Sequence, residues 1–200
     1  MSGSFPANPA PASLKIRSMQ PTLVSTAHSL QRQVRSRGGH RWMLSASWPA
    51  LTRAQWAAFY GFAQAQRGQY GTFTYVLGGY LSSPQGAGTG TPLVKGASQS
   101  GRSVITDGWT ALVTGILKAG DFIKFAGHAK VYMLTADVDS DYTGSATLAI
   151  EPALFATPAD NEAITVNNVP FTVAFGSDTR ETDVAPGKIF TFAADMIEVP

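Results

Sequence analysis

The sequence predicts a mainly β protein with one main α-helix. Twenty glycines and twelve prolines divide its 200 residues into short apolar runs. Many of these runs are rich in Val, Ile, Thr, Phe and Tyr, a composition that favours β-strands bounded by turns. Residues 51–67 are the exception, because their apolar side chains recur at helical spacing. With 44% hydrophobic and 14% charged residues, the chain suits one compact domain or a domain that carries a sizeable insertion.

Residues 51–67 carry the signals of an amphipathic helix. Thr52 is a capping residue, and Gln55, three positions later, completes a capping box. Gly68 ends the helix. One face then holds a stripe of apolar side chains that we expect to lie in the core: Trp56, Phe59, Tyr60 and Ala63.

Strands are expected on both sides of this helix. Residues 41–48 and residues 70–77 each place apolar side chains at every second position. The side chains expected on the buried sides are Trp42, Leu44, Ala46 and Trp48 in the first run and Phe73, Tyr75 and Leu77 in the second. The sequence thus predicts a strand, helix, strand unit in which the helix covers one face of a sheet.

The rest of the chain consists of loops and short strands. Residues 78–101 are expected to form a long flexible loop or a boundary, because Gly, Ser and Pro dominate their centre. The strands that follow have the spacing of a small barrel or sandwich. We expect them at residues 103–106, 111–114, 121–125, 130–135 and 145–150, with two more at 171–175 and 189–193.

Several classes of protein are excluded by what the chain lacks. There is no cysteine, so disulfides, thiolate nucleophiles and cysteine-based zinc sites are ruled out. No stretch approaches the roughly 18 consecutive apolar residues of a membrane-spanning helix, so we expect a soluble protein without membrane insertion. Residues 1–12 lack the basic start and apolar run of a secretion signal, and we expect them to form an extended N-terminal arm.

The charges are segregated along the sequence. Residues 1–106 contain no Asp or Glu and carry ten Lys and Arg, whereas residues 107–200 hold all thirteen acidic residues against five Lys and Arg. If the charges also separate in space, head-to-tail contact between identical subunits is attractive, and such contacts close into rings. If folding scatters them, the segregation has no consequence, and both alternatives stay open at this point.

No catalytic, cofactor or metal site is predicted, and we expect a protein that is not an enzyme. Asp137, Asp139 and Asp141 resemble the start of a calcium loop. However, Tyr142 stands at the glycine turn position and Leu148 at the bidentate glutamate position. An acidic hairpin turn is therefore the preferred interpretation. 

The remaining motifs are weak. His28, His40 and His128 lie far apart, and none belongs to a metal-binding helical pair. The glycine-rich residues 86–90 lack the Lys-Ser or Lys-Thr of a phosphate-binding loop. No nucleophile and base pairing is recognisable, and nothing in the sequence points to a particular pair of catalytic carboxylates.

Basic residues cluster just before and at the start of the run at 41–48: Arg32, Arg35, Arg37, His40 and Arg41. They are suited to neutralise nucleic-acid phosphates, with Trp42 stacking on a base. The alternation of the strand places Trp42 in the core instead. We therefore prefer a basic loop or rim that meets the acidic surface of a neighbouring subunit, with Arg35, Arg37 and Arg41 as subunit contacts.

Three segments resemble tail proteins of tailed phages. The first is residues 117–154, in which Gly120 and Gly144 each mark a turn that leads into a strand. The other two are the strand, helix, strand unit with its Arg67-Gly68 ending and the acidic C-terminal segment 196–199. In combination they are similar to the distal tail protein or minor tail protein family of siphophage-like tail tips.

This resemblance implies a β-sandwich-like ring domain carrying an inserted small β-barrel or sandwich domain. Residues 1–78 and 167–200 would form the ring domain, and residues 79–166 the inserted, outward-facing domain. The resemblance further implies a virion component, made in the bacterial host cytoplasm, that forms a homohexameric ring. This ring would link the tail tube to the tail tip, baseplate or receptor-binding apparatus.

The implied partners are copies of the chain itself, the tail tube protein and the hub or tip proteins, while DNA passes through the ring lumen at most transiently. Two alternatives stay open beside the adaptor. One is another tail component, such as a tube or terminator protein. The other is a carbohydrate- or receptor-binding module that uses exposed aromatic side chains, for which the candidates are Trp109, Tyr132 and Tyr142.

Overall fold

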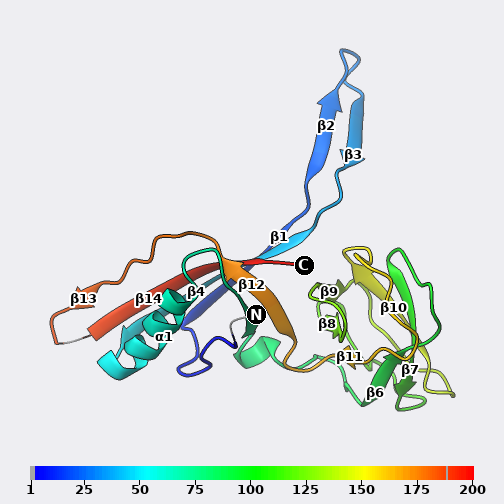
Figure 1. Cartoon of the computed structure of the whole chain (residues 1–200). Coiled ribbons are helices and arrows are strands. Elements are labelled where there is room, and N and C mark those ends of the chain that lie inside the picture. The colour runs from blue at the N-terminus through cyan, green and yellow to red at the C-terminus, as the bar shows by residue number, and fades with distance from the viewer. Residues whose placement is uncertain (1–2, 188) are drawn as a thin grey trace. The chain divides into compact units, whose positions relative to one another are not determined.

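The structure is a computed structural model that describes residues 3–187 and 189–200. Within these residues it is mainly β with one α-helix, which confirms the predicted fold class. The chain divides into two compact units. Their segments can be found in Figure 1 with the colour bar, which gives the residue numbers. Unit 1 comprises Pro11–Thr72 and Val173–Val199, and unit 2 comprises Gly3–Ala10 and Phe73–Thr172 together with Pro200.

The first sheet brings the two ends of the chain together. Its strand order is β1-β4-β14-β12-β5, and β13 also pairs with β14. Its strands are β1 (Ser13–Met19), β4 (Arg41–Leu51), β5 (Thr72–Val76), β12 (Pro170–Phe175), β13 (Val184–Ala185) and β14 (Ile189–Glu198). Because β4 lies between β1 and β14, antiparallel to both, it forms the centre of unit 1. The boundary between the units falls within β12 and at the start of β5.

The alternation predicted for two strands is confirmed. In β4, Trp42, Leu44, Ala46 and Trp48 are all buried, because successive side chains of an extended chain point to opposite faces. Around β5, the buried side chains are Phe73, Tyr75 and Leu77. Burial also raises the pKa of Tyr75 to about 12, since its ionised form would lose solvation.

The N-terminal segment is anchored instead of forming a free arm. Ser4 makes a parallel bridge with Thr74. Phe5 is buried, with its ring centroid 5.9 Å from that of Phe73 and 5.5 Å from that of Tyr75. The expectation of an extended N-terminal arm is therefore wrong for residues 3–10, and residues 1 and 2 lie outside the described part.

The helix α1 (Arg53–Ala65) has the predicted capping box. The Thr52 side chain accepts a hydrogen bond from the Gln55 backbone N–H, and the Gln55 side chain accepts one from the Thr52 N–H at 3.0 Å. The ring of Phe59 lies 5.1 Å from Trp48 and 5.7 Å from Phe192. Burying a side chain of this size contributes roughly 1.5–3 kcal/mol.

Two of the four residues predicted on the buried face of α1 lie at its margin. Phe59 and Ala63 are buried, whereas Trp56 and Tyr60 are half-buried. Trp56 stacks on Tyr60 at 4.8 Å and on Phe190 at 4.9 Å, and its indole N–H donates to the Thr182 hydroxyl at 2.9 Å. This contact ties the start of α1 to the segment that precedes β13.

Unit 2 contains a nearly closed, barrel-like sheet of six strands in the order β11-β8-β9-β10-β7-β6. The strands are β6 (Gly90–Val94), β7 (Ser103–Trp109), β8 (Phe122–Phe125), β9 (Val131–Leu134), β10 (Ala146–Glu151) and β11 (Ile164–Thr165), preceded by the 3₁₀ turn η1 (Gly79–Leu81). A bridge between Leu93 and Ala163 brings the first and last strands together. The interior is apolar and includes Trp109, Phe125 and Tyr132.

Two expectations for this region are wrong. Residues 78–101 are not loop throughout, since β6 forms inside them and pairs with β7. Residues 111–114 are a turn and not a strand. Their backbone bonds to a distant loop, because Leu112 N–H donates to Asp141 O at 3.1 Å and Val113 N–H to the Ser140 hydroxyl at 2.9 Å.

Candidate subunit-contact surface

A fully exposed hairpin, for which no strands were predicted from the sequence, precedes β4. β2 (Thr22–Thr26) and β3 (Arg32–Ser36) pair antiparallel along five residues, and we call this hairpin with its flanking residues 20–39 the arm. Its turn is closed by Leu30 N–H donating to Ala27 O at 2.9 Å and by Ala27 N–H donating to Gln31 O at 3.0 Å. Every residue from 22 to 39 is exposed, and the hairpin is the blue ribbon labelled β2 and β3 in Figure 1.

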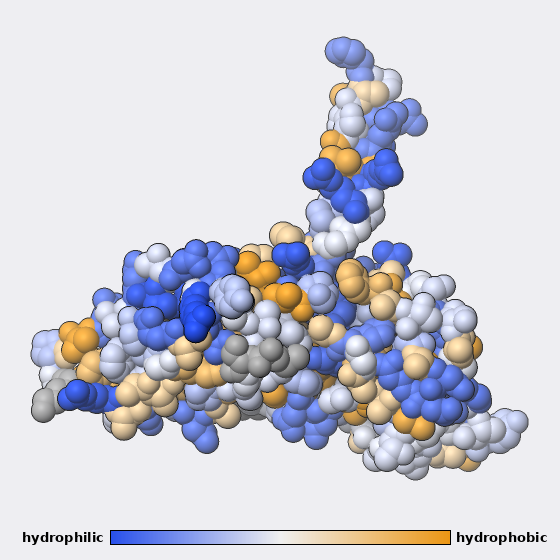
Figure 2. All heavy atoms as spheres, viewed as in Figure 1, coloured by the Kyte–Doolittle hydropathy of each residue, from blue (hydrophilic) through white to orange (hydrophobic). Residues whose placement is uncertain are grey.

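Both faces of the arm carry apolar side chains that nothing covers. Val24 lies opposite Val34 on one face, and Leu23 lies opposite Arg35 on the other. Leu23, Val24 and Val34 are each at least half exposed, and Figure 2 shows hydrophobic residues among hydrophilic ones along the arm. An isolated two-stranded hairpin is at best marginally stable in water. A surface that covered these side chains would therefore stabilise the arm.

All charged side chains of the arm are basic. It carries His28, Arg32, Arg35 and Arg37 and no carboxylate. Among the described residues, no ion pair joins a carboxylate to its three guanidinium groups, whereas ion pairs do occur in unit 2: Arg102 with Glu151, Lys118 with Asp137, and His128 with Glu162. An acidic partner surface is therefore the electrostatic complement of the arm.

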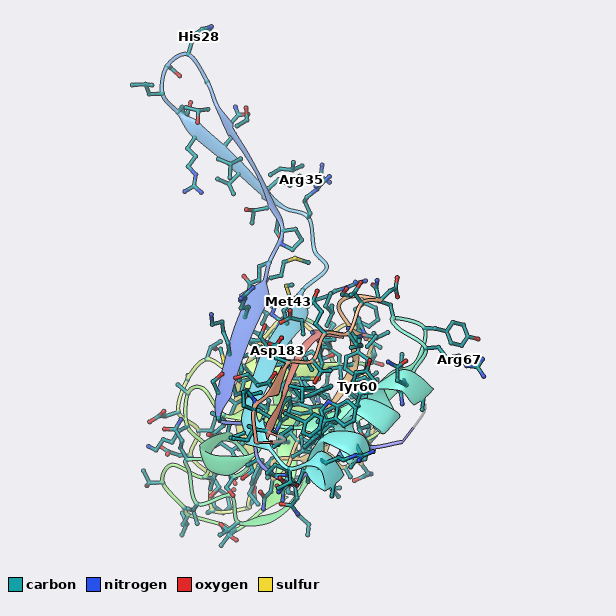
Figure 3. The ribbon with its side chains drawn as sticks, turned by 90° about the vertical axis from the view of Figure 1, so that its left-hand side faces the viewer. His28, Arg35, Met43, Tyr60, Arg67 and Asp183 are labelled. Carbon is teal, nitrogen blue, oxygen red and sulfur yellow. The ribbon has the colours of Figure 1, made fainter. Side chains whose placement is uncertain are left out.

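The three arginines predicted as subunit contacts lie along the arm and at its base. Arg35 lies near the end of β3, and Arg37 follows two residues later, just beyond the strand. The Arg37 backbone N–H donates to Pro21 O at 3.0 Å, which closes the root of the arm. Arg41 is exposed at the start of β4, opposite Met19. Figure 3 shows Arg35 projecting from the arm, with His28 at the tip.

The junction between the arm and the sheet holds two glycines and a buried tryptophan. Gly38 and Gly39 have φ angles of +69° and +72°, which side chains with a Cβ rarely adopt. His40 bonds the Ser18 hydroxyl at 2.9 Å and lies edge-on to Trp42, with the ring centroids 4.7 Å apart. Trp42 itself is only 4% exposed, so it has no free face on which a nucleic-acid base could stack.

An exposed acidic segment, residues 178–183, lies before β13. It contains Asp178, Glu181 and Asp183, and all three are exposed. Asp178 accepts a hydrogen bond from the Gln69 backbone N–H at 3.0 Å. The basic residue of the segment, Arg180, is turned inward and lies 3.9 Å over the ring of Phe175. Desolvation lowers the pKa of Arg180, while Asp178 and Asp195 act in the opposite direction.

The acidic loop of unit 2 uses its carboxylates to hold its own backbone. Asp137 bonds Lys118 at 2.8 Å, and Asp139 accepts from the Gly115 N–H at 2.6 Å. The Asp141 pKa is lowered first by the Thr143 hydroxyl and then by the Ser145 N–H. This is the acidic turn preferred from sequence, and among the described residues no group of three metal-binding side chains occurs.

The aromatic side chains proposed for carbohydrate binding are not equivalent. Trp109 and Tyr132 are 5% and 0% exposed, because both lie in the barrel interior. Their assignment to a binding surface is therefore wrong. Tyr142 is 80% exposed, and Leu112 beside it is 76% exposed. The two loops that carry these side chains are joined by the bond from Leu112 N–H to Asp141 O.

Unit 2 is a barrel-like β domain, and unit 1 carries an exposed basic hairpin. Residues 82–169 match the family of the B domain of distal tail protein pb9. No curated protein matches the chain. Within the part that the structure describes, no helix is long and apolar enough to cross a membrane.

The match lies within unit 2, so this part of the chain is similar to the pb9 B domain, which supports a tailed-phage distal tail protein family. The resemblance noted from sequence is thereby confirmed. The chain is a structural component of a phage tail, and its place is the virion.

Proposed function

We propose that this protein is a ring-forming adaptor at the distal end of the tail, which links the tail tube to the tip or receptor-binding apparatus. The observation that carries the proposal is the uncovered, wholly basic arm of unit 1. An ordered hairpin whose apolar and basic side chains all face solvent has a use only when another subunit covers it. Copies of the same chain supply such a subunit at every position of a ring.

In this proposal the two parts of the chain have different tasks. Residues 1–78 and 167–200 form the ring domain and carry the arm, with Arg35, Arg37 and Arg41 at subunit contacts. Residues 79–166 form the inserted, outward-facing domain, which offers a docking surface to the hub or tip proteins. A homohexamer that continues the lumen of the tail tube fits this role, and such a ring performs no catalysis.

The purified full-length chain tests this function. We expect rings at low salt by mass photometry and negative-stain electron microscopy, and we expect them to dissociate as salt rises, because the Debye length shrinks from about 10 Å at 0.1 M to about 3 Å at 1 M. Gold-labelled antibody on whole virions should mark the distal end of the tail. A strictly monomeric protein at low salt, or label along the whole tube, would contradict the adaptor.

A receptor-binding role is the second candidate, favoured by the exposed pair Leu112 and Tyr142. An exposed tyrosine ring can stack on a sugar, and the loops that hold this pair are fixed by hydrogen bonds. Binding of the full-length chain to host cell-surface glycans, lost in Tyr142→Ala and kept in Tyr70→Ala, would support it. Tyr70 is a suited control because it is equally exposed, in unit 1.

A further inference from the structure

The basic arm and the acidic segment lie at opposite ends of one strand ladder. The arm joins the sheet where Met19 pairs with Arg41 at the start of β4. At the other end of β4, Leu51 pairs with Phe190, and Phe190 in turn pairs with Val184 of β13. At about 3.3 Å per residue, the 11 residues of β4 separate these ends by roughly 30 Å.

The acidic segment is fixed at the β13 end by its own hydrogen bonds. The Thr191 N–H donates to Asp183 O at 3.1 Å, and the Thr182 hydroxyl donates to Thr191 O at 2.9 Å. Glu181 and Asp183 therefore stand beside the Phe190 end of β14. Because the arm leaves the sheet at the far end, the arm of a chain does not reach the acidic segment of the same unit (Figures 1 and 3).

The two surfaces also match in their apolar parts. Val184 and Ile189 are 62% and 44% exposed beside the acidic residues, just as Leu23 is 50% exposed beside Arg35 on the arm. Among the described strands, β13 pairs with β14 alone, so its other edge is free to accept a strand. A strand added at such an edge brings backbone hydrogen bonds, while the side chains set its specificity.

We infer that the arm of one copy docks on the acidic segment and β13 edge of the next copy, with Arg35 and Arg37 facing Glu181 and Asp183. This inference rests on the proposed self-assembly and names the two surfaces that meet. The contact is heterologous, since each copy gives an arm at one end and receives an arm at the other. Repetition of such a contact closes into a ring when the rotation between copies permits.

Two charge reversals test the contact. In the first variant, Arg35→Glu with Arg37→Glu makes the arm acidic, and in the second, Glu181→Lys with Asp183→Lys makes the receiving surface basic. Each variant alone should need at least about tenfold more protein than the wild type to assemble, because like charges then face each other. The matched control is Lys15→Glu with Lys95→Glu, two exposed lysines that belong neither to the arm nor to the acidic segment, which should assemble as the wild type does.

Mixing the two variants gives the decisive result. The acidic arm of the first variant fits the basic surface of the second, and the unchanged arm of the second fits the unchanged surface of the first. An equimolar mixture should therefore recover wild-type assembly with alternating subunits, resolved by native mass spectrometry of one isotope-labelled variant. Circular dichroism of each variant checks that it is folded.

The outcomes separate this inference from the function on which it rests. The docking surfaces are wrong if the two variants assemble as well as the wild type, or if their mixture stays dissociated while the wild type assembles. Neither result would contradict the proposal that the protein forms a ring. If the wild type itself stays monomeric at low salt, the self-assembly proposal fails first.

Discussion

The Glu198 carboxylate, fully buried, accepts a hydrogen bond from the Trp42 backbone N–H at 3.1 Å. This bond links the last residue of β14 to the strand that emerges from the arm. Glu198→Ala leaves the buried N–H without this acceptor and should lower the free energy of unfolding by about 1–3 kcal/mol. Glu198→Gln keeps an acceptor oxygen and should cost less. Guanidinium unfolding followed by circular dichroism measures both.

The exposed Glu181→Ala is the matched control for Glu198, and we expect it to change stability by less than about 0.5 kcal/mol. An equal effect at the two positions would mean that the buried hydrogen bond does not support the base of the arm.

The capping box of α1 should have a measurable effect on stability. Thr52→Ala removes the oxygen that accepts from the Gln55 N–H, so one donor of the first turn loses its partner. We expect a loss of about 1 kcal/mol in the free energy of unfolding, measured in urea. Gln64→Ala, at an exposed position of the same helix, is the control and should be neutral or slightly stabilising. A loss confined to Gln64→Ala would contradict the capping role.

Substitutions at two glycines allow the cost of backbone strain to be measured separately from the cost of a steric conflict. Gly101 and Gly144 have φ angles of +82° and +73°. A Cβ at Gly101 would meet nothing within 4 Å, whereas one at Gly144 would lie 2.3 Å from Trp109 O. Gly101→Ala should therefore lower the free energy of unfolding by about 1 kcal/mol from strain alone, and Gly144→Ala should lower it clearly more. Thermal unfolding of the full chain measures both. Equal losses would show that the turn at Gly144 can move away from Trp109.

Elements could be predicted from the sequence where a strand is buried on one face only, or where the residues that define an element are close together in the chain. The alternation around Trp42 and Phe73 predicted two strands, and Thr52 with Gln55 predicted the start of the helix. It failed where structure depends on distant partners. Residues 111–114 have strand-like composition, yet Leu112 takes a φ of +58° because its backbone bonds to the loop at 140 and 141.

The arm could not be recognised for a related reason. Both faces of β2 and β3 are exposed, so no hydrophobic period of two marks them as strands. The cluster of arginines indicated a contact surface from charge alone. That Arg35 and Arg37 lie on a projecting hairpin, and that Asp183 lies at the opposite end of β4, depends on long-range strand pairing, which the local sequence does not encode.

Hydrogen exchange should report directly on the arm. Its five residue pairs are exposed on both faces, and no tertiary packing stabilises them, so they should open readily in the free subunit. When a partner covers the arm, opening also requires breaking that contact, and amide exchange in residues 22–36 should slow by at least about tenfold. Mass spectrometry of deuterium uptake at low and high salt measures this change, with residues 131–134 of β9 as the internal reference because this strand lies inside unit 2. Uptake in the arm that stays equally fast in assembled and dissociated protein would show that the arm takes no part in the contact.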